Sequence, residues 1–259
     1  MPKIFSPFLI RFSGLPEIVL GYVNLNEVHP HEETDPNVLE ATRNYITKSK
    51  IIRDPIIIDR KTGTILDGTH RYAVANELGL QKIPVASVDY MDNRIRVRGW
   101  TFAVIGGTEA LNELTHEFTE SKHPLPGRIN LLYNEEYFYS EEQDPRSLLK
   151  KAREIKVNIE KIGGVVLREA FPNKNLPVLL LPYPNKWEVI NSAVNHDLFP
   201  PKSTRHVIPG RPLNLNFSIE SYEEIEKLLF KRTIRLMHPR SRIGRKIFEE
   251  EVLFFKTSD

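Results

Sequence analysis

The sequence predicts an α+β fold, with a compact module at the N-terminus and a less regular second half. In the first part, short apolar stretches that suit strands alternate with amphipathic stretches that suit helices. A strand hairpin there leads into a helix through Asp67-Gly68-Thr69-His70-Arg71. Two glycines interrupt the pattern at Ile105-Gly106-Gly107, and we place the boundary there, which predicts domains over residues 1–105 and 106–259.

Periodicity and turn residues predict each element of the first module. A strand over 17–23 precedes a polar loop, and Pro36 then fits the first turn of a helix that ends before Lys48-Ser49-Lys50. A helix that begins near Tyr72 is expected to end at Gly79, which suits a C-cap. The remaining strands are expected at 55–59, 64–66, 83–88 and 94–102.

The second half offers fewer elements. Helices are predicted over 109–118 and 146–161, the second with an apolar stripe along one side, and a buried strand over 176–181. Another helix is expected to open at Ser221, whose spacing to Glu224 fits a capping box, and to run to about residue 230.

The turn Asp67-Gly68-Thr69-His70-Arg71, hereafter the anion turn, has the composition of a phosphate-binding site. Glycine lets the backbone approach a ligand, and a helix start offers unpaired N–H groups and the positive end of the helix dipole. His70 and Arg71 add donors and positive charge, while Asp67 can accept a proton or hold a metal ion. A purely structural interpretation stays open, in which Thr69 caps the helix, Arg71 pairs with a surface acid and Asp67-Gly68 is only a turn.

Composition excludes several classes of protein. The 259 residues are 40% hydrophobic, enough for a sizeable core. No apolar run approaches the ~18 residues of a membrane span, and proline interrupts the first apolar stretch too early for a signal peptide, so we expect a cytoplasmic protein without a membrane partner. The absence of cysteine excludes disulfides and cysteine nucleophiles. A net charge of +2 gives no global field that favours nucleic acid, and no specific nucleic-acid partner is expected.

The loop His29-Pro30-His31-Glu32-Glu33 gathers histidines and carboxylates. Two histidines in a loop without a third at a recognised spacing indicate zinc only weakly. Glu32 is more interesting as a general base, because it would meet the anion turn if the strand near Leu20 lies beside the strand that ends at Asp67.

Two basic segments remain. Pro200-Pro201-Lys202-Ser203-Thr204-Arg205-His206, continuing to Pro209-Gly210-Arg211, is a second candidate for anion binding or a solvated basic loop. Lys231 to Lys246 contains seven Lys or Arg and is flanked by acids at Glu220, Glu223, Glu224, Glu226 and Glu249 to Glu251. Local ion pairing is therefore the favoured explanation, although a partner surface stays open. Trp100 suits either the core or the wall of a ligand pocket.

The order of these motifs resembles a known family. His31-Glu32, Pro55-Ile56-Ile57-Ile58 and the anion turn are similar to the ParB/sulfiredoxin fold, and Trp100 with Ser203-Thr204-Arg205-His206 narrows the resemblance to the archaeal free L-serine kinases. The match spans both halves of the chain. The family usually has histidine where this chain has Thr69, which leaves a main-chain phosphate cradle but not that side chain.

The resemblance implies a ParB/sulfiredoxin-like module that binds nucleotide phosphates, and a second α/β domain that forms a cleft with it and contributes a substrate loop. Its reaction would transfer a phosphoryl group from ADP or ATP to the hydroxyl of free L-serine, giving O-phospho-L-serine for cysteine synthesis. Glu32 would accept the hydroxyl proton, and Asp67 would be a second catalytic residue and a ligand of Mg²⁺. The implied donor-phosphate site is Gly68, Thr69, His70 and Arg71, and the implied serine site is Trp100, Ser203, Thr204, Arg205 and His206.

Three other functions can be compared with the same residues. Sulfiredoxin chemistry requires a cysteine, which the chain lacks. A ParB-like DNA-associated protein or nuclease normally carries a helix-turn-helix after the nucleotide module, and none is convincing here. A regulatory nucleotide-binding module would need the anion turn but neither Glu32 nor Trp100. The kinase is the favoured hypothesis, and the sequence does not choose between ADP and ATP.

Overall fold

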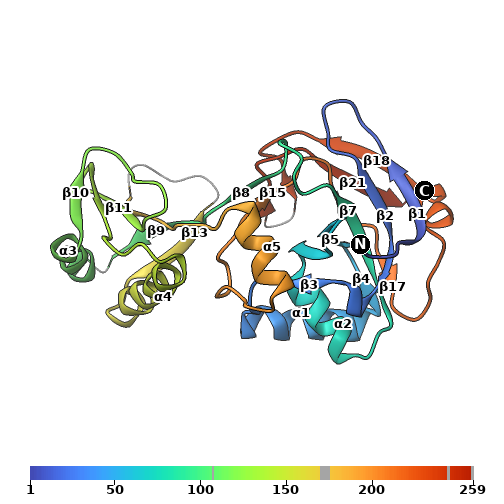
Figure 1. Ribbon diagram of the computed structural model, residues 1–259, viewed down its shortest axis with the longest axis horizontal. Coiled ribbons are helices and arrows are strands. Elements are labelled where there is room, and N and C mark those ends of the chain that lie inside the picture. The colour runs from blue at the N-terminus through green and yellow to red at the C-terminus, as the bar shows by residue number, and fades with distance from the viewer. Residues whose placement is uncertain (107, 170–175, 244–245, 258–259) are drawn as a thin grey trace. The chain divides into compact units, whose positions relative to one another are not determined.

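The computed structural model describes residues 1–106, 108–169, 176–243 and 246–257, and contacts divide the chain into two units (Figure 1). The first unit comprises residues 1–96, 186–201 and 206–259, and the second comprises 97–185 and 202–205. This division differs from the boundary expected near residue 105, of which Gly107 lies outside the described residues. The physical reason is that the C-terminal segment packs into the first unit, which local sequence patterns do not reveal.

The first unit is built on a mixed six-stranded sheet of order β1-β2-β7-β5-β6-β3. The expected strands are present with small shifts, and the strands are β1 (Phe5–Ile10), β2 (Ile18–Asn24), β3 (His29–Pro30), β5 (Ile56–Asp59), β6 (Thr64–Asp67) and β7 (Lys82–Val88). β5 runs parallel to β7, and β3 parallel to β6. Every residue of β5 is buried, as expected for a central strand covered on both faces.

Two helices of this unit pack against each other: α1 (Pro36–Ser49) and α2 (Thr69–Glu77). Pro36 is the first residue of α1, as predicted, and Asp35 caps it by accepting from the main-chain N–H groups of Asn37 and Val38. The second helix begins at Thr69, three residues before the expected start, because Gly68 already takes the N-cap position. A 3₁₀ turn, η1 (Leu25–Glu27), follows β2.

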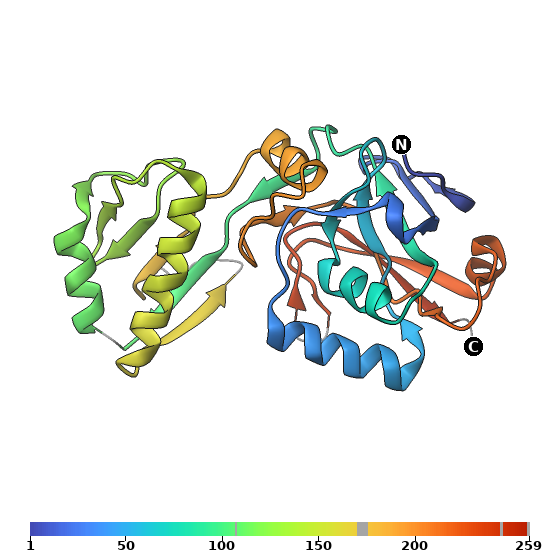
Figure 2. The same ribbon diagram turned by 60° about the horizontal axis from the view of Figure 1, so that its bottom comes forward.

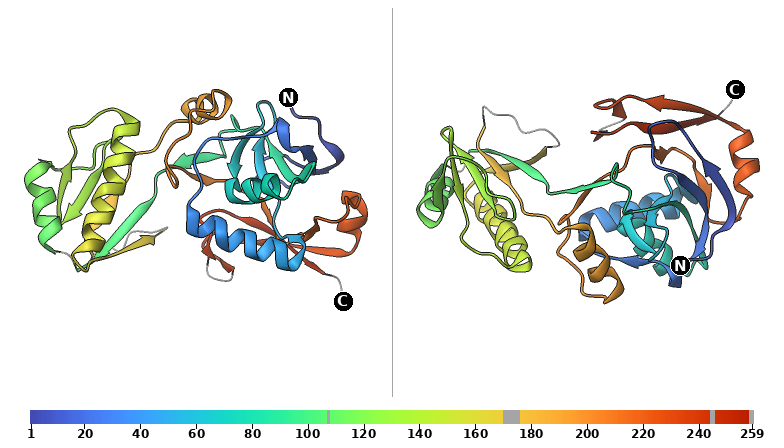
Figure 3. Two further views of the ribbon diagram at one scale, coloured as in Figure 1. Left: turned by 90° about the horizontal axis from the view of Figure 1, so that it is seen from below. Right: turned by 45° about the horizontal axis from the view of Figure 1, so that its top comes forward.

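The C-terminal part of the first unit was mostly not predicted. It contains α5 (Lys186–Val194), α6 (Ile225–Phe230) and a three-stranded sheet of β16 (Arg211–Leu213), β21 (Val252–Thr257) and β18 (Arg232–Met237). Figure 3 shows these C-terminal strands, in red, beside the blue N-terminal strands, and α6 contacts β1. The predicted capping box at Ser221 is wrong, since α6 begins four residues later, with Glu224 as an N-cap that makes no side-chain cap hydrogen bond.

Short paired strands complete the described chain. β4 (Ile51–Ile52) pairs with β17 (Phe217–Ser218), and β19 (Arg242–Ile243) pairs with β20 (Lys246–Ile247). The single strand expected over 94–102 is two strands, β8 (Arg96–Arg98) and β9 (Thr101–Ile105), and β8 pairs with β15 (Arg205–Val207).

The second unit is an antiparallel sheet of order β10-β12-β11-β14-β9-β13, with two helices against it (Figure 2). The helices are α3 (Thr108–Glu117) and α4 (Pro145–Lys161), both close to their predicted bounds. The further strands are β10 (Thr119–Ser121), β11 (Asn130–Tyr133), β12 (Glu136–Tyr139), β13 (Val165–Glu169) and β14 (Val178–Leu180). Its core consists of apolar side chains, with Leu148 and Ile159 of α4 packed among Phe102, Leu131 and Leu179 of the sheet.

The confirmed fold class is thus mixed α and β. Among the described residues, no helix combines the length and apolar character that a membrane-spanning helix requires.

Candidate active site

A parallel strand pair brings the Glu32 loop to the anion turn. β3 pairs with β6 with His29 opposite Thr64 and Pro30 opposite Ile65. The pairing ends at Pro30, so the loop that carries Glu32 follows the strand beside the one that ends at Asp67, while Glu32 itself forms a bridge with Phe199. This neighbour of β6 is β3 and not the strand near Leu20, because β2 lies between β1 and β7. A two-residue strand is too short to be recognised by periodicity, which is why it was not predicted.

The Glu32 loop is fixed on its other side by the segment that follows α5. The Glu33 N–H donates to the Phe199 carbonyl at 2.8 Å, and the Phe199 N–H donates to the His31 carbonyl at 3.0 Å. The buried Ser192 hydroxyl also donates to the His31 carbonyl, at 2.9 Å. The Glu32 side chain is 17% exposed, whereas Glu33 is an exposed residue. The main chain therefore orients one of the two adjacent carboxylates toward the interior.

The anion turn has a backbone that glycine alone accepts readily. Gly68 has a φ of 106°, and a Cβ there would lie 2.6 Å from Cγ2 of Ile56 and 2.8 Å from Nη2 of Arg71. Thr69 is buried as the first residue of α2, and a hydroxyl capping role is not observed, since Gly68 occupies the N-cap. The first amides of α2 therefore start directly after a residue without a side chain, which is the arrangement that binds phosphate.

The two cationic residues of the turn have partners inside the protein. The Nη1 of Arg71 donates to the carbonyls of Asp54 at 2.7 Å and Pro55 at 2.9 Å, and its Nη2 donates to Asp67 at 2.9 Å. The His70 ring accepts at Nε2 from the Asp35 N–H at 2.9 Å, which links the starts of α1 and α2. Arg71 thus holds the shape of the turn, in agreement with part of the structural interpretation, while the partner of Nε2 leaves the His70 Nδ1 as its protonated nitrogen.

Asp67 lies at the exposed edge of an ionic network that is buried at Arg211 and Glu250 and that the sequence did not predict. Its Oδ2 accepts from Arg71 and also from the Nη1 of Arg211 at 2.7 Å. The Arg211 side chain is 9% exposed, and its Nε donates to Oε1 of the buried Glu250 at 3.2 Å. Burial alone would lower the pKa of Arg211, but the charges of Asp67 and Glu250 raise it. Removal of one partner from a buried ion pair typically destabilises a protein by about 3–5 kcal/mol.

A buried cluster of His31, His206 and Tyr90 lies in the same unit. The His31 Nδ1 donates to the Ile65 carbonyl at 2.6 Å, and its ring meets that of His206 edge-on at 5.4 Å. The Tyr90 hydroxyl lies 2.7 Å from Nε2 of His206. Burial lowers the pKa of His31 to about 4. Burial, then His31 and the charge of Arg211, lower the pKa of His206 well below its ordinary value, so both rings are neutral at pH 7.

The remaining residues of the implied serine site lie in the second unit. Trp100, Ser203, Thr204 and Arg205 belong to it, whereas His206 belongs to the first unit. Nε1 of Trp100 donates to the Thr204 carbonyl at 2.9 Å, and the Arg205 guanidinium lies 5.6 Å from the Trp100 ring centre. Two segments about a hundred residues apart are therefore joined at Trp100, and Ser203 and Thr204 are both buried.

No group of three or more His, Asp or Glu side chains suited to a metal ion occurs within the described ranges. At the anion turn, Asp67 is the carboxylate that could contact Mg²⁺. Its Oδ2 already accepts from two guanidinium groups, so a water-mediated contact fits this geometry better than direct coordination. The histidine-rich loop likewise offers no zinc set, because the His31 Nδ1 is bonded to a carbonyl.

The basic segment from Lys231 to Lys246 shows local pairing, as predicted, at Lys231, whose Nζ lies 3.0 Å from Glu223. Two acids after the segment pair elsewhere, with Glu249 at 3.7 Å from Arg96 and Glu250 beside Arg211. Residues 244 and 245 lie outside the described residues.

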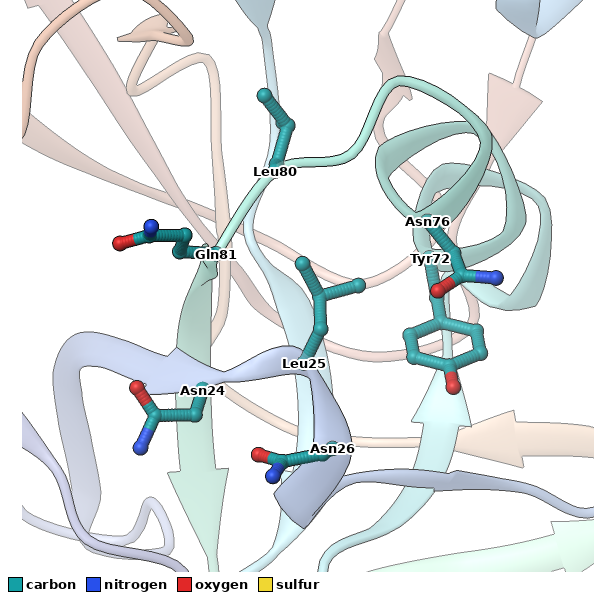
Figure 4. Close-up of a pocket in the computed structure, with 7 residues that line it drawn as sticks. All are labelled: Asn24, Leu25, Asn26, Tyr72, Asn76, Leu80 and Gln81. Carbon is teal, nitrogen blue, oxygen red and sulfur yellow. The ribbon is translucent and has the colours of Figure 1, made fainter.

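A pocket away from the anion turn is drawn in Figure 4. It is lined by amide, aromatic and leucine side chains, namely Asn24, Leu25, Asn26, Tyr72, Asn76, Leu80 and Gln81. Tyr72 and Asn76 come from α2, and Leu80 and Gln81 follow its C-terminal end. It contains no charged lining residue and none of the predicted site residues, so its chemistry does not suit phosphate.

Comparison with known proteins gives related sequences over most of the chain. No family model matches. A ParB-like protein of Sulfolobus acidocaldarius is 28% identical and covers 73% of this chain and 90% of its own length. An ATP-dependent L-serine kinase of Staphylothermus marinus is 26% identical over 76% of this chain and 89% of its own length. The ADP-dependent L-serine kinase SerK of Thermococcus kodakarensis is also 26% identical, covering 77% and 91%.

The chain is related to the archaeal L-serine kinases. The resemblance drawn from its motifs is thereby confirmed. Among solved structures, a free serine kinase in complex with AMP superimposes with a TM-score of 0.61 at 22% identity, covering 83% of this chain and 96% of that one. At this identity the likeness shows the fold alone.

Proposed function

We propose that the protein is a free L-serine kinase that transfers the terminal phosphoryl group of ADP or ATP to the serine hydroxyl, giving O-phospho-L-serine. The observation that supports the proposal is the pairing of β3 with β6, because Glu32 follows β3 by two residues and β6 ends at Asp67, next to the start of α2. The L-serine kinase relatives support the same reaction, and their names include both nucleotides as donors. Use of the product for cysteine synthesis is part of the proposal.

The reaction requires a base and a phosphate cradle. Glu32 accepts the proton as the serine oxygen attacks the terminal phosphorus, so that an O–P bond forms and the bond to the bridging oxygen breaks. The leaving nucleotide is AMP from ADP or ADP from ATP. Its phosphates are held by the first amides of α2 after Gly68, with donors from Thr69 and His70. Asp67 would hold Mg²⁺ through water, and the ion would supply positive charge to the phosphate oxygens.

The serine site is proposed at Trp100, Ser203, Thr204, Arg205 and His206. Arginine beside the Trp100 ring supplies a charge suited to a carboxylate, and a neutral His206 supplies a hydrogen bond without a second fixed charge. The neighbouring Tyr90 hydroxyl holds the His206 ring in place through Nε2, with which it can act as donor or acceptor.

Phosphorus NMR tests the proposal directly. The purified protein is incubated with Mg²⁺, L-serine and either ATP or ADP, and a phosphoserine resonance that requires both serine and enzyme is expected. Parallel reactions with the two nucleotides give the preferred donor. Nucleotide hydrolysis without phosphoserine would reject the assignment of serine as acceptor.

A DNA-associated function is the alternative, favoured by the similarity to a ParB-like protein and by the basic segment from Lys231 to Lys246. We expect DNA binding to be weak and non-specific, because the net charge is only +2. A salt titration with a labelled duplex distinguishes the two. Sequence-dependent nanomolar affinity that survives ~0.2 M salt would favour the DNA function.

A further inference from the structure

Arg211 joins three segments that are far apart in the chain. Its Nη1 donates to Asp67 of the anion turn at 2.7 Å, its Nη2 to the main-chain carbonyl of His206 at 2.8 Å, and its Nε to Glu250 at 3.2 Å. Each nitrogen of the guanidinium therefore has its own acceptor. All four residues lie in the first unit.

These three contacts fix the Arg211 guanidinium in one position. A guanidinium is planar, so three acceptors placed around its edge fix its position and its orientation. Glu250 is itself buried, and its Oε1 also accepts from the Ile208 N–H at 3.4 Å, which holds the carboxylate against the turn between β15 and β16. The main-chain N–H of Arg211 in turn donates to the Ile208 carbonyl at 3.1 Å.

We propose that Arg211 is a positioning residue that sets the anion turn in register with His206, so that the donor phosphates and the acceptor serine are held at a reactive separation. The inference rests on the proposed function. Arg211 itself needs no contact with either substrate, because it acts through the Asp67 carboxylate and the His206 main chain. Glu250 serves as the anchor that keeps the guanidinium in place.

Substitution by lysine separates this role from simple charge balance. Arg211→Lys keeps a positive charge but loses the planar fork, so one ammonium cannot serve all three acceptors in their present directions. Misplacement of reacting groups by about 1 Å lowers turnover by about 10²-fold. We therefore expect kcat to fall by about 10–10²-fold, while nucleotide affinity measured by calorimetry changes by less than about threefold.

A matched control comes from Arg60, another arginine of the first unit. Its Nη1 donates to Glu17 at 2.9 Å, away from the anion turn. Arg60→Lys makes the same chemical change in a partly buried ion pair and should leave kcat within about twofold of wild type.

A double-mutant cycle distinguishes positioning from a general effect on the fold. Because Arg211 acts partly through Asp67, the double variant Asp67→Asn with Arg211→Lys should lose clearly less kcat than the product of the two single losses. Losses that multiply, or an unchanged kcat in folded Arg211→Lys, would overturn the inference.

A substitute variant and a wild-type control complete the test. If Arg211→Lys does not fold, Glu250→Gln takes its place in the cycle, since it keeps the anchor's shape and removes its charge, and the same non-additivity is required. Wild type is assayed in parallel: if it makes no phosphoserine, the proposed function and this inference fail together, whereas an active wild type with an equally active Arg211→Lys rejects only the inference.

Discussion

The two units bury different side chains beneath sheets of the same strand number. Among the described residues, the buried histidine, arginine and carboxylate side chains all lie in the first unit, and they are His31, Asp59, His206, Arg211 and Glu250. The second unit buries an apolar cluster and only uncharged polar residues, among them Asn130 and Ser140. Because a buried charge is unfavourable without a partner, its presence requires a closely specified surrounding. On the proposed function, the base and the phosphate site therefore belong to the first unit, whereas the second unit adds uncharged and arginine side chains of the serine site to an apolar core.

The largest effect on turnover is expected from a substitution in the first unit, at Glu32. Glu32→Gln keeps the shape of the side chain and removes the proposed base, so turnover should fall by about 10²–10⁴-fold with nearly constant nucleotide affinity. Glu33→Gln is the control, since that side chain is exposed and should have little effect. Steady-state kinetics with calorimetry measure both. Equal losses in the two variants would exclude Glu32 as the base and make Asp67 the next candidate.

A core substitution in the second unit tests its packing role. Leu131→Ala removes a side chain that is fully buried in the apolar cluster, and should lower the free energy of unfolding of that unit by about 2–5 kcal/mol. Amide exchange in β11 and β14 reports this loss. Nucleotide affinity should be unchanged, and a parallel loss of affinity would contradict the division of roles.

The buried histidines of the first unit predict a pH dependence of stability. The pKa of His31 is lowered from 6.5 to about 4, so the unfolded chain binds more protons between these values. The free energy of unfolding therefore has its full value above pH 6.5. It falls as the pH decreases toward 4, by about 3 kcal/mol for His31 alone. His206, whose pKa is also lowered, adds to the same trend.

The variant His31→Asn keeps a donor for the Ile65 carbonyl and removes the titrating group. Urea unfolding of the first unit, followed by amide exchange in β5 and β7 at pH 7 and pH 5, should show a smaller pH dependence in this variant. The exposed His123→Asn is the control and should match wild type. An equal pH dependence in all three proteins would exclude His31 as its source.

The smallest effect concerns two helices that start alike. Asp35 caps α1 and Asp144 caps α4, each followed by proline, and each Asp→Ala change should lower stability by about 0.5–2 kcal/mol. Only Asp35→Ala should also alter nucleotide affinity, because loss of the cap loosens the start of α1, where the Asp35 N–H donates to His70 of the anion turn. Thermal unfolding and calorimetry on the pair measure this difference, and identical behaviour of the two variants would contradict it.

Local sequence patterns identified the anion turn but not what surrounds it. Gly68 and the adjoining strand and helix follow from a motif of five consecutive residues, and Pro36 marked the first residue of α1. Arg211 looked like part of a solvated basic loop, because arginine is usually exposed. Its burial depends on Asp67 and Glu250, which are distant in the chain and carry no local signal. The same reason applies to Ser192 and Phe199, which hold the Glu32 loop.

The discontinuity of the first unit has a consequence for the order in which the chain folds during synthesis. The second unit is almost contiguous, so it can form its sheet as soon as residue 185 and the short segment after it have left the ribosome. The first unit is completed only when Arg211 and Glu250 have followed Asp67 in synthesis, because the buried Arg211 charge is paired with both carboxylates. The unit that begins the chain is therefore the last to be completed, and its ionic network closes as a late, long-range step.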